Sequence, residues 1–227
     1  STLWYCITCM AKYFKVRPIK GKGNILALEF SKEIPMGMMF MRFQEYSEGI
    51  KGVRDKSPMP EGDILYKYFK KTKKVYYKAG WAGFNLRGDL FLEYVNSGKF
   101  ALNILEQKLV YLIRDEFDWK GLGNKFFIIA YHKGDKATKK HELLHALYYL
   151  NPIYRARVDS ILCVANLKKA RKYLKKLGYG LGGTHGDYIF YDEIQAYVLT
   201  DKPKIVKAFG LSKKVIRKLQ ALKREYY

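Results

Sequence analysis

The pattern of apolar and polar residues predicts short strands, most of them in the first part of the chain. Asn24–Ser31 follows a Gly-Lys-Gly turn and is typical of a strand, and Lys125–Tyr131 is a nearly continuous apolar run that predicts a buried strand. Met38–Glu45 is another apolar run, and Tyr66–Lys78 alternates aromatic and basic residues, so we expect strands there as well. Leu3–Phe14 predicts a strand or a short buried helix.

Helical spacing dominates the second part of the chain. Ala101–Glu116 repeats leucine and isoleucine on one face of a helix, and a shorter helix is expected over Asp89–Ser97. Thr138 can cap a helix that starts at Lys139 and ends before the Asn-Pro pair at 151–152. Further helices are expected over 153–165, 166–177, 192–200 and, as one or two basic amphipathic helices, 202–227.

Strands that come early and helices that come late predict an α+β fold. We expect a β-rich N-terminal part over residues 1–100 and a helical part that carries the chemistry over residues 101–227. A length of 227 residues suits one compact domain made of both parts.

The charge of the chain is strongly positive. It has 43 basic and 21 acidic residues, a net charge of +22, and such an excess attracts polyanions. Lysines cluster in residues 67–78, 168–176 and 213–224. This pattern is compatible with non-specific contact with nucleic acid or an acidic protein substrate, while a solvated surface is the ordinary explanation for most of these lysines.

The cysteine content and hydropathy indicate a protein of a reducing compartment. Three cysteines are too few for a disulfide framework, and the Cys6–Cys9 pair has no second pair with which to form a structural zinc site. We therefore expect a cytoplasmic location. No apolar run reaches the length of a transmembrane segment, and the first residues lack the features of a signal peptide.

The pentapeptide His141-Glu142-Leu143-Leu144-His145 carries the clearest chemistry. Residues four apart lie on one face of a helix, so both imidazoles can bind a single zinc ion. Glu142 is one residue round the helix and can deprotonate the water on that ion, which is the role of a general base. Only four histidines occur in the chain, so finding two of them in this pattern favours a metal site.

A catalytic zinc site needs a third protein ligand and an open position for water. Glu193 is one candidate, because the segment Glu193-Ile194-Gln195-Ala196-Tyr197 is amphipathic and a helix would hold its carboxylate rigidly. His185, which lies between glycines, is the rival ligand. Asp192 is placed to orient a ligand histidine, or else to face solvent.

An oxyanion stabiliser is also expected, because hydrolysis develops negative charge on an oxygen and a histidine or tyrosine can donate a hydrogen bond to it. His185 is one candidate if it does not bind the metal. Tyr197 lies one helical turn beyond Glu193 and could face the same side. Tyr188 and Tyr191 compete with it, and core packing is an ordinary alternative for all three tyrosines.

The combination of His-Glu-x-x-His with Glu-x-Gln-Ala resembles the zincin metallopeptidases of gluzincin type. Residues 193–197 are similar to the third-ligand helix of the ImmA/IrrE-like peptidases, and the whole resemblance covers about residues 125–200. It implies a zincin-like fold with a mixed or antiparallel sheet, Zn2+ as cofactor and Glu193 as the third ligand. It also suggests that the strand Lys125–Tyr131 is a sheet edge to which an extended peptide substrate pairs.

These observations predict a zinc metallopeptidase that hydrolyses peptide bonds with a water activated by Glu142. The alternative is a basic, nucleic-acid-associated binding protein with a structural or degenerate zinc site. A third hypothesis is an accessory protein of a virus or mobile element. Glu142 separates the first two, because a purely structural site has no need of a base between its ligands.

Overall fold

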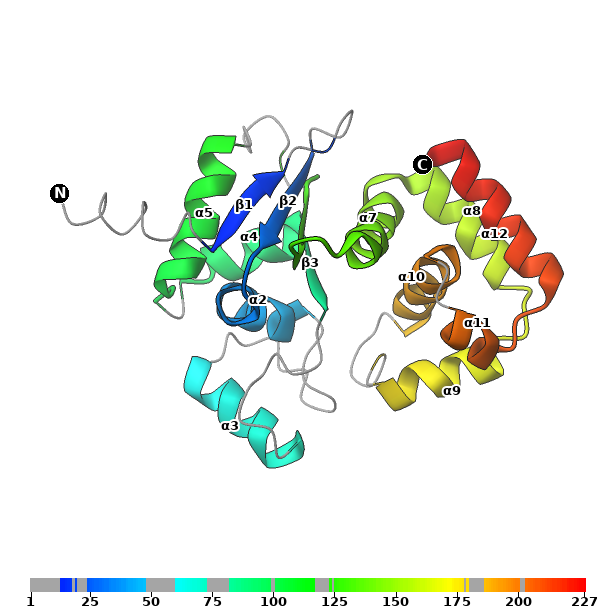
Figure 1. Ribbon diagram of the computed structural model, residues 1–227, viewed down its shortest axis with the longest axis horizontal. Coiled ribbons are helices and arrows are strands. Elements are labelled where there is room, and N and C mark those ends of the chain that lie inside the picture. Colours follow the sequence, from blue (N-terminus) through cyan, green and yellow to red (C-terminus); the bar gives the residue numbers. More distant parts are fainter. Residues whose placement is uncertain are drawn as a thin grey trace. The chain divides into compact units, whose positions relative to one another are not determined.

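The computed structural model of the chain has an α+β fold with a small mixed sheet and a mostly helical remainder (Figure 1). It describes residues 13–17, 19, 24–47, 60–72, 82–98, 101–116, 123, 125–177, 179, 186–200 and 203–227. Most of the segment Leu3–Phe14 lies outside these residues. The chain divides into two units, one formed by Ser1–Gly49 with Asp55–Lys139 and one containing Lys140–Tyr227. The boundary expected near residue 100 therefore falls inside the first unit.

The first unit is built on a four-stranded sheet with the order β1-β2-β4-β3. The strands are β1 (Phe14–Arg17), β2 (Ile25–Phe30), β3 (Gly83–Arg87) and β4 (Phe127–His132). β2 and β4 pair in parallel, and β1 and β3 are antiparallel to their neighbours. The predicted strands at Asn24–Ser31 and Lys125–Tyr131 are thus confirmed. Their nearly continuous apolar sequence suits strands that are buried between neighbours.

The expectation that Lys125–Tyr131 is a sheet edge is wrong. β4 lies between β2 and β3, and both of its hydrogen-bonding sides are occupied along its length. For example, Ile129 is paired with Ala27 on one side and Asn85 on the other. An extended peptide therefore has no free backbone edge on β4 with which to pair.

The prediction of a strand over Met38–Glu45 is also wrong, because this segment lies within helix α2 (Glu33–Ser47). Nearly every side chain from Pro35 to Tyr46 is buried. A helix that is apolar all round has no polar face, so periodicity alone does not distinguish it from a buried strand. Phe40 stacks on Phe84 of β3, with ring centroids 5.5 Å apart, which fixes α2 against the sheet.

Helix α3 (Glu61–Thr72) replaces the first half of the strand pair expected over Tyr66–Lys78, and residues 73–78 lie outside the described part. The alternation of aromatic and basic residues was misleading. Ile64 is fully buried, whereas 45 % of Phe69 is exposed. Helices α4 (Gly88–Asn96) and α5 (Ile104–Glu116) agree with the helices expected from apolar spacing.

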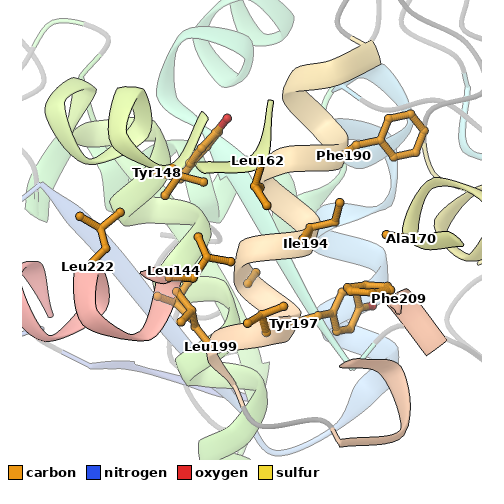
Figure 2. Packing of buried hydrophobic residues seen from close by; sticks show 14 of the residues in the cluster. Leu144, Tyr148, Leu162, Ala170, Phe190, Ile194, Tyr197, Leu199, Phe209 and Leu222 are labelled. Carbon is orange, nitrogen blue, oxygen red and sulfur yellow. The ribbon is translucent and has the colours of Figure 1, made fainter. Parts of the chain in front are cut away.

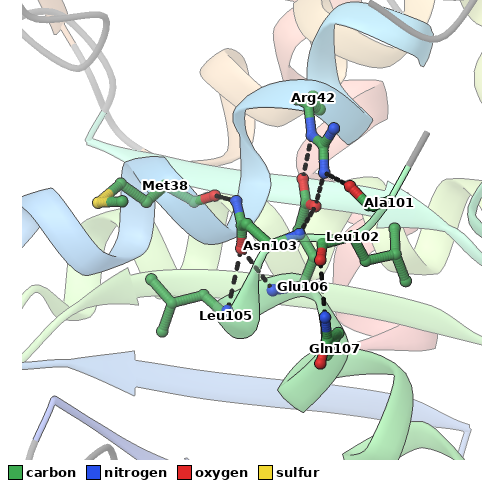
Figure 3. Close-up of polar contacts among 8 residues, drawn as sticks. All are labelled: Met38, Arg42, Ala101, Leu102, Asn103, Leu105, Glu106 and Gln107. Carbon is green, nitrogen blue, oxygen red and sulfur yellow. Dashed lines mark hydrogen bonds and ion pairs between the residues drawn. The ribbon is translucent and has the colours of Figure 1, made fainter. Parts of the chain in front are cut away.

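A buried ion pair fixes α5 to α2 (Figure 3). Arg42 donates from Nε to Glu106 Oε1 at 2.7 Å and from Nη2 to the Ala101 carbonyl at 3.0 Å, and it contacts the second oxygen of Glu106 as well. Asn103 caps α5 by accepting from the backbone N–H groups of Leu105 and Glu106. Glu106 accepts in return from the Asn103 N–H at 2.9 Å, which completes a capping box.

The second unit consists of helices. They are α7 (Lys136–Leu150, whose first four residues belong to the first unit), α8 (Pro152–Leu162), α9 (Lys168–Leu177), α10 (Gly186–Leu199), α11 (Pro203–Phe209) and α12 (Lys213–Tyr226). α7 begins three residues earlier than expected. The cap is Asp135 and not Thr138. The Asp135 carboxylate accepts hydrogen bonds from the backbone N–H of Thr138 at 2.9 Å and from the hydroxyl of Thr138 at 2.6 Å.

Helix α10 runs through the middle of the second unit and packs against α8, α9, α11 and α12. Its apolar side chains Phe190, Ile194 and Leu199 join Leu144 of α7 in one continuous hydrophobic cluster (Figure 2). α10 begins at Gly186, so it includes the helix expected over 192–200 and extends it by nearly two turns. None of the described helices is long and apolar enough to cross a membrane.

Candidate metal centre

Helix α7 brings His141 and His145 together as their spacing predicts. The two Nε2 atoms lie 3.1 Å apart, and the ring centroids lie 4.7 Å apart with the ring planes nearly perpendicular. Both side chains are buried, at 7 % and 2 % exposure. Two nitrogens that converge in this way can bind one ion between them.

Glu193 of α10 completes the group. Its Oε2 lies 3.8 Å from His141 Nε2, and its Oε1 lies 3.8 Å from His145 Nε2. Two atoms that each bind one zinc-sized ion at about 2.1 Å are at most about 4.2 Å apart, so all three separations are compatible with a shared ion. The buried side chains of His141, His145 and Glu193 can therefore hold a metal ion. Glu193 lies within α10 rather than at its first residue, so the helix holds the backbone of Glu193 rigidly.

Asp192 is partly buried and lies beside the candidate ligand His145. Its Oδ1 is 2.8 Å from His145 Nδ1, the ring nitrogen that points away from His141 and Glu193. A carboxylate on the second nitrogen of a ligand histidine fixes the orientation of the ring and makes the first nitrogen a stronger donor to metal. The hypothesis that Asp192 orients a ligand histidine thus agrees with the geometry.

Gln195 holds Asp192 in place, and sequence reasoning missed this role. The fully buried amide donates from Nε2 to Asp192 Oδ1 at 3.1 Å and to the Leu144 carbonyl at 3.2 Å. Its Oε1 accepts from the Tyr154 hydroxyl at 2.9 Å. A signal was present in the sequence, since a glutamine between Ile194 and Ala196 on a buried apolar helix requires polar partners.

The electrostatics of the site favour a cation. Burial disfavours the charged form of His145, but the carboxylates of Asp192, Glu193 and Glu142 outweigh this effect and raise its pKa to about 10. So many carboxylates around two imidazoles attract positive charge, and a divalent ion can supply it in place of a proton.

Glu142 and Tyr197 both lie near the ligands. Glu142 is buried, and its carboxylate is close enough to raise the pKa of both His145 and Tyr197. The Tyr197 ring centroid is 4.7 Å from that of His141, and its hydroxyl lies 3.3 Å from the hydroxyl of Tyr179. Burial and then Glu193 raise the pKa of Tyr197, so its hydroxyl stays protonated and can donate a hydrogen bond.

The remaining candidates for the third ligand or the oxyanion stabiliser are His185, Tyr188 and Tyr191. His185, the rival third ligand, lies outside the described residues. Tyr188 packs on the Tyr148 ring at 5.1 Å and under the guanidinium of Arg155 at 5.9 Å, which is a packing role. Tyr191 is half-buried against the hydrophobic cluster of the second unit.

Comparison with protein-family models, curated proteins and solved structures gave no match for this chain. The chemistry of the site is therefore inferred from its own donor atoms. Two imidazole nitrogens and one carboxylate, with a further carboxylate from Glu142 beside them, form a donor set that can bind a metal and also accept a proton.

Proposed function

We propose that this chain is a zinc-dependent metallopeptidase of gluzincin type. One observation supports this most strongly. His141, His145 and Glu193 converge as a buried group suited to a metal ion, while the carboxylate between the two histidines in sequence, Glu142, is buried beside them. A site that only stabilised the fold would need a fourth ligand and would gain nothing from that additional carboxylate.

Zinc fits the donor set best. Histidine nitrogen and carboxylate oxygen are typical zinc ligands, and three protein ligands leave a fourth position open. His141, His145 and Glu193 would hold the ion, and Asp192 would keep the His145 ring in place from Nδ1. When bound, zinc would lower the pKa of a water molecule and polarise the carbonyl of the scissile bond.

The chain's own residues would then move the protons and stabilise charge. The Glu142 carboxylate would take a proton from the attacking water and deliver it to the nitrogen of the leaving amine. The protonated Tyr197 hydroxyl would donate a hydrogen bond to the developing oxyanion. The burial of the ligands supports this chemistry, because hydrogen bonds and charges act more strongly where water is excluded.

The test is the substitution Glu142→Gln in the full chain. It keeps the shape of the side chain and removes its basicity, so the variant should retain zinc while hydrolysis of a quenched-fluorescence peptide library falls by about 10²- to 10⁴-fold. Glu225→Gln, which changes an exposed carboxylate, is the charge-matched control and should leave hydrolysis unchanged. Full activity in Glu142→Gln would rule out the assigned base.

A further inference from the structure

Helix α12 presents a face of exposed cations that the metal site does not use. Lys213, Lys214, Arg217 and Lys218, the basic face of α12, are all exposed, and their spacing places them together on one side of the helix. The opposite side is in the core, where Leu219 and Leu222 are 0 % and 2 % exposed (Figure 2 shows Leu222). The orientation of the basic face is therefore fixed by packing.

Within the described part of the chain, no ion pair neutralises the basic face. The nearby acidic residue Glu225 is bound to Arg157, at 3.1 Å to one of the guanidinium nitrogens. Lys223, further along α12, donates to the Leu199 carbonyl at 2.8 Å. The four cations of the basic face are thus distinct from the basic residues that hold α12 in place.

The clustering of like charges on the basic face destabilises α12. The pairs Lys213/Arg217 and Lys214/Lys218 place like charges one turn apart, which destabilises a helix. The first turn of α12 contains no acidic residue, so the cations there also oppose the helix dipole. Like charges that destabilise a helix, and that no opposite charge among the described residues compensates, indicate that the helix binds a partner. An anionic partner would offset the repulsion between these cations.

We propose that the basic face of α12 binds the phosphate backbone of double-stranded DNA. From Lys213 to the exposed Arg224 the helix is about 16 Å long. The major groove of B-DNA is about 12 Å wide and admits an α-helix. Lysines that outnumber arginines suit contact with phosphates rather than reading of bases.

The connection between α11 and α12 supports this partner. Only Gly210, Leu211 and Ser212 separate the two helices (Figure 1). Gly210 has φ +63°, a left-handed backbone conformation that favours glycine. Ser212 caps α12 by accepting from the Val215 N–H at 3.3 Å. DNA-binding proteins often use two helices joined by such a short glycine turn to present the second helix to the major groove.

Other anionic partners fit less well. Single-stranded nucleic acid is bound by stacking of bases on exposed aromatic rings, and the basic face carries none. An amphipathic helix binds a membrane through its apolar side, but in α12 that side, at Leu219 and Leu222, is buried in the core. Both partners are therefore alternatives that the experiment must exclude.

The experiment measures binding of the full chain to a fluorescein-labelled 20-base-pair duplex by anisotropy between 50 and 200 mM salt. Four phosphate contacts contribute about −3.6 to the slope of log K against log salt, which is about a 150-fold loss of affinity over this range. Replacing Lys213, Lys214, Arg217 and Lys218 together by Gln should reduce the magnitude of the slope by that amount and weaken binding at 50 mM by at least about 10-fold.

A matched control removes the same charge elsewhere. Gln at the four exposed lysines of the first unit, Lys32, Lys70, Lys125 and Lys133, should leave the slope as in the wild type. Circular dichroism checks that both variants fold. An unchanged slope in the α12 variant, an equal loss in both variants, or tighter binding to a single strand or to anionic phosphatidylserine vesicles than to the duplex would overturn the proposal. The variant Glu142→Gln should bind the duplex like the wild type, which keeps this test separate from hydrolysis.

Discussion

At the scale of single residues, the orientation of His145 depends on side chains outside the candidate metal-binding group. Tyr154 donates to Gln195, Gln195 donates to Asp192, and Asp192 lies 2.8 Å from His145 Nδ1. Three helices, α8, α10 and α7, are joined in this way. The hydroxyl of Tyr154, the amide of Gln195 and the carboxylate of Asp192 are joined by hydrogen bonds, and the carboxylate lies against His145 Nδ1, so these side chains favour one orientation of the ring.

Asp192→Ala should therefore weaken zinc binding by about 10- to 100-fold, since the ring of His145 loses the carboxylate that orients it. Competition with a fluorescent chelator measures the affinity. Asp159→Ala is the matched control, because Asp159 accepts from the Tyr148 hydroxyl in the same unit but is not among the ligands or their partners. It should lower stability and leave zinc affinity unchanged. Equal affinities of Asp192→Ala and the wild type would contradict the orienting role.

At the scale of secondary structure elements, the Arg42–Glu106 pair determines how α5 is attached to α2. Both side chains are buried, at 5 % and 0 % exposure, and Glu106 is also part of the capping box of α5. The partners are thus desolvated, and each relies on the other for compensation of its charge. This distinguishes the pair from surface ion pairs such as Arg87–Asp89, where about 30 % of each side chain is exposed.

Arg42→Met should destabilise the first unit by about 3–5 kcal/mol, because it leaves the Glu106 carboxylate buried without a counter-charge. Urea denaturation followed by circular dichroism measures the change. The double variant Arg42→Met/Glu106→Leu should recover part of the loss, since both charges are then removed. Arg87→Met is the surface control and should cost less than about 1 kcal/mol. A loss at Arg42 no greater than that at Arg87 would show that the buried pair does not hold these helices together.

Buried strands and helices with one apolar stripe could be predicted from the sequence, and the helix buried on nearly all sides could not. β2, β4, α4 and α5 agree with their patterns, because each has either a uniformly buried strand sequence or one apolar helical stripe. The sequence of α2 predicts a strand, since a helix surrounded by the core has no polar face to reveal its period. The sequence alone does not locate the start of α7, because Asp135 and Thr138 are both good caps and only the hydrogen bonds identify Asp135.

At the scale of the whole molecule, the candidate metal site belongs entirely to the second unit. His141, His145 and Glu193 all follow Lys139, at which the first unit ends. The pentapeptide on α7 made the two histidines predictable from local spacing alone. The nearness of Glu193 could not be derived in this way, because it depends on how α10 packs against α7. The sequence indicates that Gln195 needs polar partners, but it does not identify them, since the three partners come from three helices.

The measurement that tests the site most directly is the zinc content of the purified full chain, combined with X-ray absorption at the zinc edge. One zinc per chain is expected, with two imidazole nitrogens and at least one oxygen at about 2.0–2.1 Å. The variants His141→Ala and Glu193→Ala should lose the zinc, and the variant Asp159→Ala should keep it. A chain that binds no zinc, or that binds it equally well without His141 and Glu193, would contradict the assignment of these side chains as a metal centre.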